Sequence, residues 1–176
     1  MYKGFRLKNL KTIEVEDKNY VGRGSFSSVY SIGQNKVVKI FHIPLWDWDS
    51  RPNPCHIEEF IMQHRVYRAG MEVAKPYEMC RVRVEWDDEI RIGFTMDDLG
   101  RKPVSEDRSR HMVETYDSFY SVEGSVANNI GIRPWDRHGK NAMVLPDGSI
   151  KRIDLGCWEY RDKNKARWAA KQGTQK

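Results

Sequence analysis

The amino-terminal part of the chain alternates short apolar runs with turn residues. Between residues 10 and 42, runs such as Val37-Val38-Lys39-Ile40-Phe41 are separated by turn signals at 16–19 and 33–35. Apolar or alternating runs of about four to eight residues between turn signals are typical of β-strands. The pattern therefore predicts a series of strands over this segment.

A helix is expected over residues 56–69, because Pro54 opens this polar-apolar segment and Gly70 closes it. The preceding segment, 44–54, is rich in Trp, Asp and Pro, which favours a loop. Its tryptophans are expected to pack as a lid over the helix or, alternatively, to face a partner.

The rest of the pattern predicts strands first and helices later. Two strands are expected over 77–85 and 89–96, joined by a turn at 86–88. One or two helices are expected over about 105–128, and a small hairpin should turn at 146–149, where the sequence reads Pro-Asp-Gly-Ser.

Composition describes an ordinary, rather polar globular protein. The chain has 176 residues, of which 39% are hydrophobic and 31% are charged, enough for one compact unit or two small lobes around a cleft. No apolar stretch approaches the roughly 18 residues of a membrane span, and no signal peptide is recognisable, so we expect a cytoplasmic protein with no membrane partner. Its three cysteines, an odd number without Cys-x-x-Cys spacing, are expected to be reduced.

The net charge of +5 is mild, and the basic residues are spread along the chain. One denser stretch lies at 161–171. We expect a solvated terminal helix or tail there. The alternative is an electrostatic contact with nucleic acid or with an acidic partner protein.

The most informative chemistry lies near the carboxyl end. Asp136 is followed by Asn141 five positions later, and Asp154 follows Asn141 after thirteen more. Metal-assisted phosphoryl transfer needs a carboxylate to orient the attacking hydroxyl, together with an Asn and a second carboxylate to hold Mg²⁺ on the phosphates. We therefore expect Asp136 to be catalytic and Asn141 and Asp154 to be metal ligands, with Lys140 offsetting charge on the γ-phosphate.

A glycine-rich turn precedes these residues by about a hundred positions. Gly22 and Gly24 lie between two expected strands, where backbone amides can approach phosphates without side-chain obstruction. A dinucleotide-binding turn would instead open a helix, and a P-loop would continue with Gly-Lys-Ser/Thr. Lys39 follows in the next apolar run, where a buried lysine is costly unless it meets an anion. We expect Lys39 to contact the α- and β-phosphates, and Lys39→Ala to lower transfer by orders of magnitude while leaving the fold intact.

Taken in order, the glycine turn, the strand lysine, a helix glutamate, the Asp-x₄-Asn loop and Asp154-Leu155-Gly156 resemble a protein kinase-like enzyme. The segment 58–76 is similar to RIO-type atypical kinases and their small relatives, and the resemblance covers about residues 20–156. Either Glu58 or Glu59 would brace Lys39. Glu59 is favoured, because it lies eleven residues before Gly70, the spacing seen in the RIO-like relatives.

The resemblance implies an α+β, kinase-like bilobal fold with a β-rich N-terminal lobe and a strongly truncated helical C-terminal lobe. The expected division is 1–96 for the N-terminal lobe, 97–160 for the reduced C-terminal lobe and 161–176 for the basic tail. The implied cofactors are ATP and Mg²⁺. Contacts to the nucleotide are then expected from the glycine turn, two strands, a hinge and the hairpin after the catalytic loop: Gly22, Gly24, Ser25, Phe26, Val29, Val37, Met96, Asp97, Leu99 and Met143.

The chain departs from the family pattern at several places. Ser27 replaces the third glycine of the turn, Trp135 precedes the catalytic Asp without the usual His, and only twenty residues follow Gly156. No peptide-binding platform fits in that length. We expect a minimal serine/threonine protein kinase, including autophosphorylation or ATP hydrolysis, that depends on a protein substrate or activating partner. A small-molecule phosphotransferase and a nucleotide-stabilised partner-binding module are the alternatives.

Overall fold

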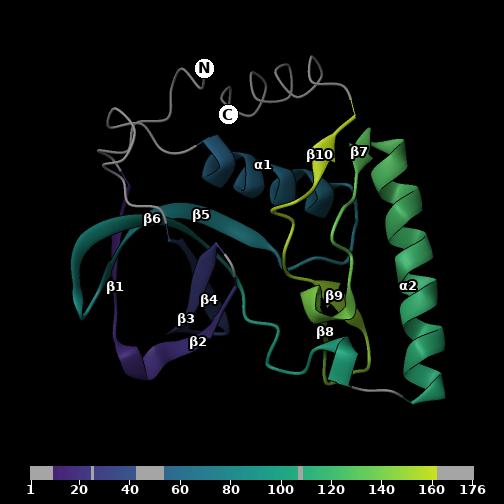
Figure 1. The fold of residues 1–176 in the computed structure, drawn as a ribbon, viewed down its shortest axis with the longest axis horizontal. Helices are drawn as coiled ribbons and strands as arrows, with labels where there is room; N and C mark the ends of the chain where they lie inside the picture. Colours follow the sequence, from purple (N-terminus) through teal and green to yellow (C-terminus); the bar gives the residue numbers. More distant parts are fainter. Residues whose placement is uncertain (1–9, 25, 43–53, 107–108, 162–176) are drawn as a thin grey trace. The chain divides into compact units, whose positions relative to one another are not determined.

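The structure is a computed structural model, and it describes residues 10–24, 26–42, 54–106 and 109–161 (Figure 1). These residues form a mixed α+β structure with a curled sheet and few helices. They fall into two compact units. The first, here called the sheet unit, comprises the described parts of 5–60 and 75–98; the second, the α2 unit, comprises 61–74 and 99–161.

The sheet unit contains one six-stranded sheet in the order β1-β5-β6-β4-β3-β2. All neighbouring strands are antiparallel except β1 and β5, which are parallel. The strands are β1 (Thr12–Val15), β2 (Tyr20–Arg23), β3 (Ser27–Gly33), β4 (Lys36–Phe41), β5 (Pro76–Val84) and β6 (Asp87–Asp97). A 3₁₀ turn, η2 (Asp17–Asn19), occupies the first predicted turn, and the predicted series of strands is confirmed.

Turn chemistry sets the register of the hairpins. Gln34 and Asn35 connect β3 to β4 with φ angles of 52° and 54°, as in the two-residue turns whose twist matches that of a hairpin. The β5–β6 turn starts one residue before the predicted 86–88 and ends two residues before it. Val84 pairs with Asp87, so the turn residues are 85 and 86. Asp87 belongs to the strand because its carboxylate accepts the Glu89 N–H at 3.0 Å and so holds the start of β6.

The two faces of the sheet are chemically different. Lys39 lies opposite Val29 and Phe94, and Val37 lies opposite Met96, so the period of two places these side chains on one face. The other face carries an apolar core formed by Val15, Tyr30, Val38, Ile40, Cys80, Val82 and Val84.

Helix α1 (Pro54–Arg68) confirms the helix predicted over 56–69. It begins at Pro54, where a missing N–H costs nothing, and ends before Gly70, whose φ of 81° an L side chain would rarely adopt. In the sheet unit the Phe60 ring lies 5.5 Å from that of Phe94. The later part of the helix supplies Met62 to the core of the α2 unit.

In the α2 unit a single long helix, α2 (Arg110–Asn129), fills most of the predicted helical region. Ser109 caps it, since the Ser109 hydroxyl accepts the Met112 N–H at 3.2 Å. A 3₁₀ turn, η4 (Val104–Glu106), precedes it. Two apolar clusters hold the unit together, one of Met62, Val66, Met71, Val73, Ala127, Ile132, Leu155 and Trp158 and one of Val104, Met112, Ala142, Val144 and Ile150.

Two small hairpin-like sheets complete the α2 unit. β8 (Ala142–Val144) and β9 (Ile150–Arg152) form the predicted hairpin, and a second sheet pairs β7 (Ile132–Arg133) with β10 (Glu159–Tyr160). The second pairing had not been predicted, because two-residue strands carry no periodicity.

Two sequence expectations fall outside the described residues, namely the tryptophan-rich segment 44–54, save its last residue, and the basic tail beyond Arg161. Among the helices that are described, none combines the length and apolar character of a membrane span.

Candidate functional site

The sheet unit contains a buried ion pair between β4 and α1. The Lys39 ammonium nitrogen lies 2.5 Å from Oε1 of Glu59, and each side chain is only 6% exposed. Removing two charges from water is expensive, so the pair depends on close contact and on further polar neighbours. Glu58, the other glutamate considered from the sequence, is exposed.

Three of the predicted adenine contacts share the sheet face of Lys39. Val37 and Met96 are buried and Val29 is half-buried, all within the sheet unit. The resulting surface is apolar around one lysine, which suits a flat apolar ring next to an anion. Leu99 and Met143, which were also predicted, belong to the α2 unit, where Leu99 is buried and Met143 is half-buried and pairs with Lys151.

The glycine turn connects β2 and β3. Gly22 lies in β2, and the Gly24 N–H donates to the Ser27 carbonyl at 2.8 Å. Among the described residues, a Cβ on Gly22 would meet nothing within 4 Å, and one on Gly24 only ordinary contacts at 3.8 Å. Local packing in the protein therefore gives no reason for glycine at either position. Phe26 exposes 73% of its surface, and Ser25 lies outside the described residues.

The predicted hinge begins at the end of β6. The Asp97 carboxylate accepts the Tyr77 hydroxyl at 2.6 Å and the Lys75 N–H at 3.2 Å, while the Asp98 N–H donates to the Asn35 carbonyl at 2.8 Å. These bonds hold the end of the strand within the sheet unit. Leu99, the next residue, is buried and is the first of the α2 unit.

In the α2 unit the predicted catalytic loop folds back on itself. The side-chain amide of Asn141, at the end of the 3₁₀ turn η5 (Gly139–Asn141), donates to the Asp136 carbonyl at 3.1 Å and to its carboxylate at 3.2 Å. The other carboxylate oxygen lies 3.1 Å from Nε2 of His138. Asp136 has a φ of 54°, uncommon for a residue other than glycine, and such strain often marks functional sites.

Asp154 lies next to a backbone link with this loop. The Ile153 N–H donates to the Asn141 carbonyl at 3.0 Å, and the Asp154 carboxylate accepts the Gly156 N–H at 3.0 Å. Lys140 is exposed. Asn141 uses its amide nitrogen toward Asp136, so its side-chain oxygen, the atom that binds Mg²⁺, remains as acceptor.

A buried arginine supports the loop, and the sequence analysis missed it. Arg152, in β9, is 0% exposed and makes two 2.8 Å hydrogen bonds to the carboxylate of Glu123 in α2. It also donates to the His138 carbonyl at 3.1 Å. Burial alone lowers the pKa of Arg152, but the hydrogen bonds and charge of Glu123 outweigh it, and the pKa is raised. Nothing in the run Ile150-Lys151-Arg152 separates a buried arginine from an exposed one.

A second arginine ties the loop to α2. The Arg137 guanidinium lies 3.6 Å from the centre of the Tyr120 ring and donates to the Tyr120 carbonyl at 2.9 Å. The Arg137 carbonyl in turn accepts the Tyr116 hydroxyl at 2.6 Å. The Asp136–Asn141 segment is therefore positioned by helix α2 on one side and by β9 on the other.

The donor chemistry fits Mg²⁺ bound to a nucleotide. Mg²⁺ usually takes one or two carboxylates, with phosphate oxygens and waters completing its shell, and Asn141 and Asp154 offer that kind of set. Across the described ranges, no three His, Cys, Asp or Glu side chains form a self-sufficient metal cage. No protein-family model matches the chain, and no curated protein matches it either. The function proposed below rests on the residues and geometry given above.

Proposed function

We propose that this protein is an ATP- and Mg²⁺-dependent phosphotransferase of the protein kinase-like class, acting as a minimal serine/threonine protein kinase. The buried pair of Lys39 and Glu59 carries the proposal. Lys39 lies on the second strand after the glycine turn, and a helix glutamate braces it. This arrangement holds a lysine toward nucleotide phosphates. The apolar face around it suits an adenine ring.

The α2 unit contributes the acidic groups in this proposal. Asp136 accepts or orients the proton of the acceptor hydroxyl, and its carboxylate is held in place by Asn141. Asn141 and Asp154 would hold Mg²⁺, which supplies positive charge to the phosphate oxygens. Lys140 offsets charge on the transferred group. Each set of side chains acts mainly by positioning and electrostatic stabilisation.

The glycines support the same function. Among the described residues, no neighbour would clash with a Cβ on Gly22 or Gly24, and neither glycine has a positive φ. Close approach of the backbone to a ligand is a common remaining reason for glycine in a turn. We propose that Gly22, Gly24, Ser25 and Phe26 cover the phosphates. Following the RIO-like resemblance, the proposed acceptor is a protein hydroxyl, including one of this chain, in a cytoplasmic setting.

The test is incubation of the pure protein with γ-labelled ATP and Mg²⁺, following both protein labelling and phosphate release. Asp136→Asn is a sharper test than Asp136→Ala, because asparagine tolerates a φ of 54° and leaves the loop conformation in place. Loss of the carboxylate should lower transfer by roughly 10²–10⁴-fold. Asp117→Asn, an exposed aspartate of α2, is the matched control and should leave the rate unchanged.

Turnover that persists in Asp136→Asn contradicts the proposed mechanism. Wild-type protein that neither labels itself nor releases phosphate, yet melts at a higher temperature with ATP, contradicts transfer by the chain alone. That result would favour the alternative of a nucleotide-stabilised binding module. Transfer to sugars or antibiotics in place of protein would favour a small-molecule phosphotransferase.

A further inference from the structure

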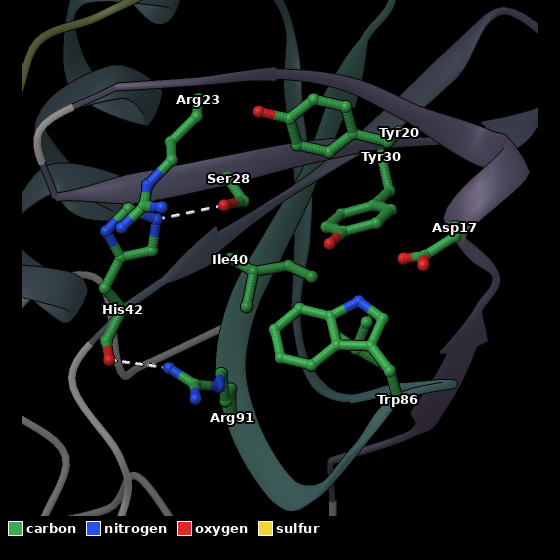
Figure 2. A pocket seen from close by; sticks show the side chains of 10 residues that line it. Asp17, Tyr20, Arg23, Ser28, Tyr30, Ile40, His42, Trp86 and Arg91 are labelled. Atoms are coloured by element: carbon green, nitrogen blue, oxygen red, sulfur yellow. Dashed lines mark hydrogen bonds between the residues drawn. The ribbon is translucent and has the colours of Figure 1, made fainter.

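The sheet unit contains a hollow of about 450 Å³. Figure 2 shows the side chains that line it. It lies on the sheet face opposite Lys39. The register accounts for its position. Tyr20 pairs with Tyr30 and Ser28 pairs with Ile40, so these side chains point away from the Lys39 face, which carries the alternate residues of the same strands. Within the sheet unit, the hollow and the Lys39–Glu59 pair therefore lie on opposite faces of the sheet.

One side of the hollow is aromatic. The rings of Tyr20 and Tyr30 are 5.5 Å apart and nearly perpendicular, at 73°. Tyr30 is buried and forms the floor, whereas Tyr20 and Trp86 remain 49% and 64% exposed. Burial raises the pKa of Tyr30, so its hydroxyl stays neutral at physiological pH. Exposed aromatic faces beside a hollow are natural stacking surfaces for a planar group.

The other side of the hollow is cationic (Figure 2). Arg91 is largely neutralised, because its guanidinium lies 2.6 Å from the Asp87 carboxylate and donates to the His42 carbonyl. Arg23 differs, since it makes no ion pair with any residue in the described part of the chain. The His42 ring nitrogen lies 2.9 Å from the Ser28 hydroxyl. This side is suited to an anion, in a chain of net charge +5.

A single carboxylate completes the lining at the aromatic side. Figure 2 places Asp17 beyond Tyr30 and Trp86, on the side away from Arg23. It would repel an anion there and would accept hydrogen bonds from N–H groups at the edge of a planar ring. A ligand in the hollow would therefore be favoured in one orientation, with its anionic group near Arg23 and its N–H edge toward Asp17.

We propose that this hollow binds one nucleotide unit, with the base stacked on Tyr20 and Trp86, its N–H edge toward Asp17 and its phosphate at Arg23 and His42. The volume lies within the roughly 300–1,000 Å³ of small-molecule sites. A phosphotyrosine ring would fit the stacking surface and the cations, but it has no N–H edge for Asp17. The nucleotide unit belongs either to a free mononucleotide or to single-stranded RNA, which uses the same stacking and charge.

The experiment measures binding of GMP and of a short fluorescein-labelled single-stranded RNA to the full chain, in EDTA to remove Mg²⁺-dependent binding. For whichever probe binds, Trp86→Ala should lower the affinity by roughly tenfold or more, because a stacking ring is lost. Arg23→Ala should also lower the affinity and should reduce the salt dependence of binding. Both residues are exposed, so neither substitution should unfold the sheet. Trp86→Phe keeps a ring and should recover most of the affinity.

The matched controls are Tyr67→Ala and Arg110→Ala, an exposed aromatic and an exposed arginine outside the hollow, and neither should change binding. Guanosine, which lacks the phosphate, should bind more weakly than GMP. If GMP and RNA bind with comparable affinity, a mononucleotide is sufficient to fill the hollow. If only RNA binds, the hollow is an RNA-binding site. No binding of either probe up to about 1 mM overturns the proposal. Binding that ignores Trp86 and Arg23, or preference for a phosphotyrosine peptide over both probes, also overturns it.

The result is independent of phosphoryl transfer. Asp154→Asn should leave binding in the hollow unchanged, while it should abolish the Mg²⁺-dependent activity proposed above. Failure of one proposal can therefore be recognised without failure of the other.

Discussion

Replacing Lys39 by methionine should destabilise the sheet unit as well as remove the proposed activity. Methionine keeps the length and flexibility of the lysine stem but removes the charge, which leaves the Glu59 carboxylate buried without its cation. From the sequence alone, a substitution at Lys39 was expected to spare the fold. The burial of both partners changes that expectation.

The magnitude follows from the geometry. At 2.5 Å and an effective dielectric constant of about 20, the direct attraction between the charges is roughly 7 kcal/mol. Much of this is offset by the cost of removing both groups from water, and breaking one side of such a pair typically costs about 3–5 kcal/mol. For a chain of this size, that corresponds to a melting temperature lowered by roughly 6–20 °C.

The assay is thermal and urea unfolding of four proteins: wild type, Lys39→Met, Glu59→Leu and the double variant. Because the double variant removes both buried charges and keeps similar volumes, it should recover most of the stability lost by either single variant. Arg83→Met is the control, since the Arg83–Glu14 pair is 3.4 Å apart and exposed. Its effect should stay below about 1 kcal/mol.

Two results would refute this reasoning. The first is a Lys39→Met protein that unfolds at the same temperature and urea concentration as the Arg83→Met control. That result would mean that the pair does not stabilise the sheet unit. The second is a double variant whose loss equals the sum of the single losses, which would mean that the two side chains do not interact.

Three further predictions test two positions in the sheet and the reactivity of two cysteines. Gly93→Ala should lower the free energy of unfolding by about 1–3 kcal/mol or more, because a Cβ there would lie 2.5 Å from the Lys39 carbonyl oxygen. Asp87→Asn should cost about 1–3 kcal/mol at neutral pH, because the backbone hydrogen bond and the arginine partner that lower the pKa of Asp87 favour its charged form. This difference should disappear as the pH falls below about 4 and through the lowered native pKa, where the carboxylate is protonated in both states. Iodoacetamide should label the exposed Cys157 in the native protein and spare Cys80, whose pKa burial raises to about 12, as measured by peptide mass spectrometry.

The contradicting outcomes are distinct. Gly22→Ala has open space for its Cβ and serves as control, so equal melting temperatures for this variant and Gly93→Ala would contradict the packing argument. A stability difference at Asp87 that persists unchanged at pH 2 would show that charge is not its source. Native labelling of Cys80 at the rate of Cys157 would show that the sheet opens readily.

Local patterns predicted most elements within a few residues, because short strands and capped helices carry their own signals. The helix ending at Gly70 and the hairpin around 146–149 depend on residues next to one another in the chain. Pairing between distant segments was not predictable in this way. The parallel contact of β1 with β5 and the two-residue pairing of β7 with β10 depend on which edges remain available after the rest has folded.

For the candidate site, the order and spacing of the polar residues could be read from the sequence. Phosphoryl transfer needs particular polar groups at particular spacings, and this is why the glycine turn, Lys39, Glu59 and the Asp136–Asn141 loop were predicted as a site. That Lys39 is buried against Glu59, and that Glu58 is exposed, follows from the folded structure alone. The sequence does not show which of the two adjacent glutamates is buried, because burial depends on which face of the helix packs against other segments.

The same limit explains the features that the sequence concealed. Arg152 and Glu123 are twenty-nine positions apart and no local pattern marks them, yet they form a buried pair that supports the Asp136–Asn141 loop. The hollow beside Tyr20 and Trp86 likewise exists only because a curled sheet brings β2 and the β5–β6 turn around one space. Spacing along a chain determines local geometry and chemistry, whereas burial and cavities arise from contacts between segments that the chain order does not specify.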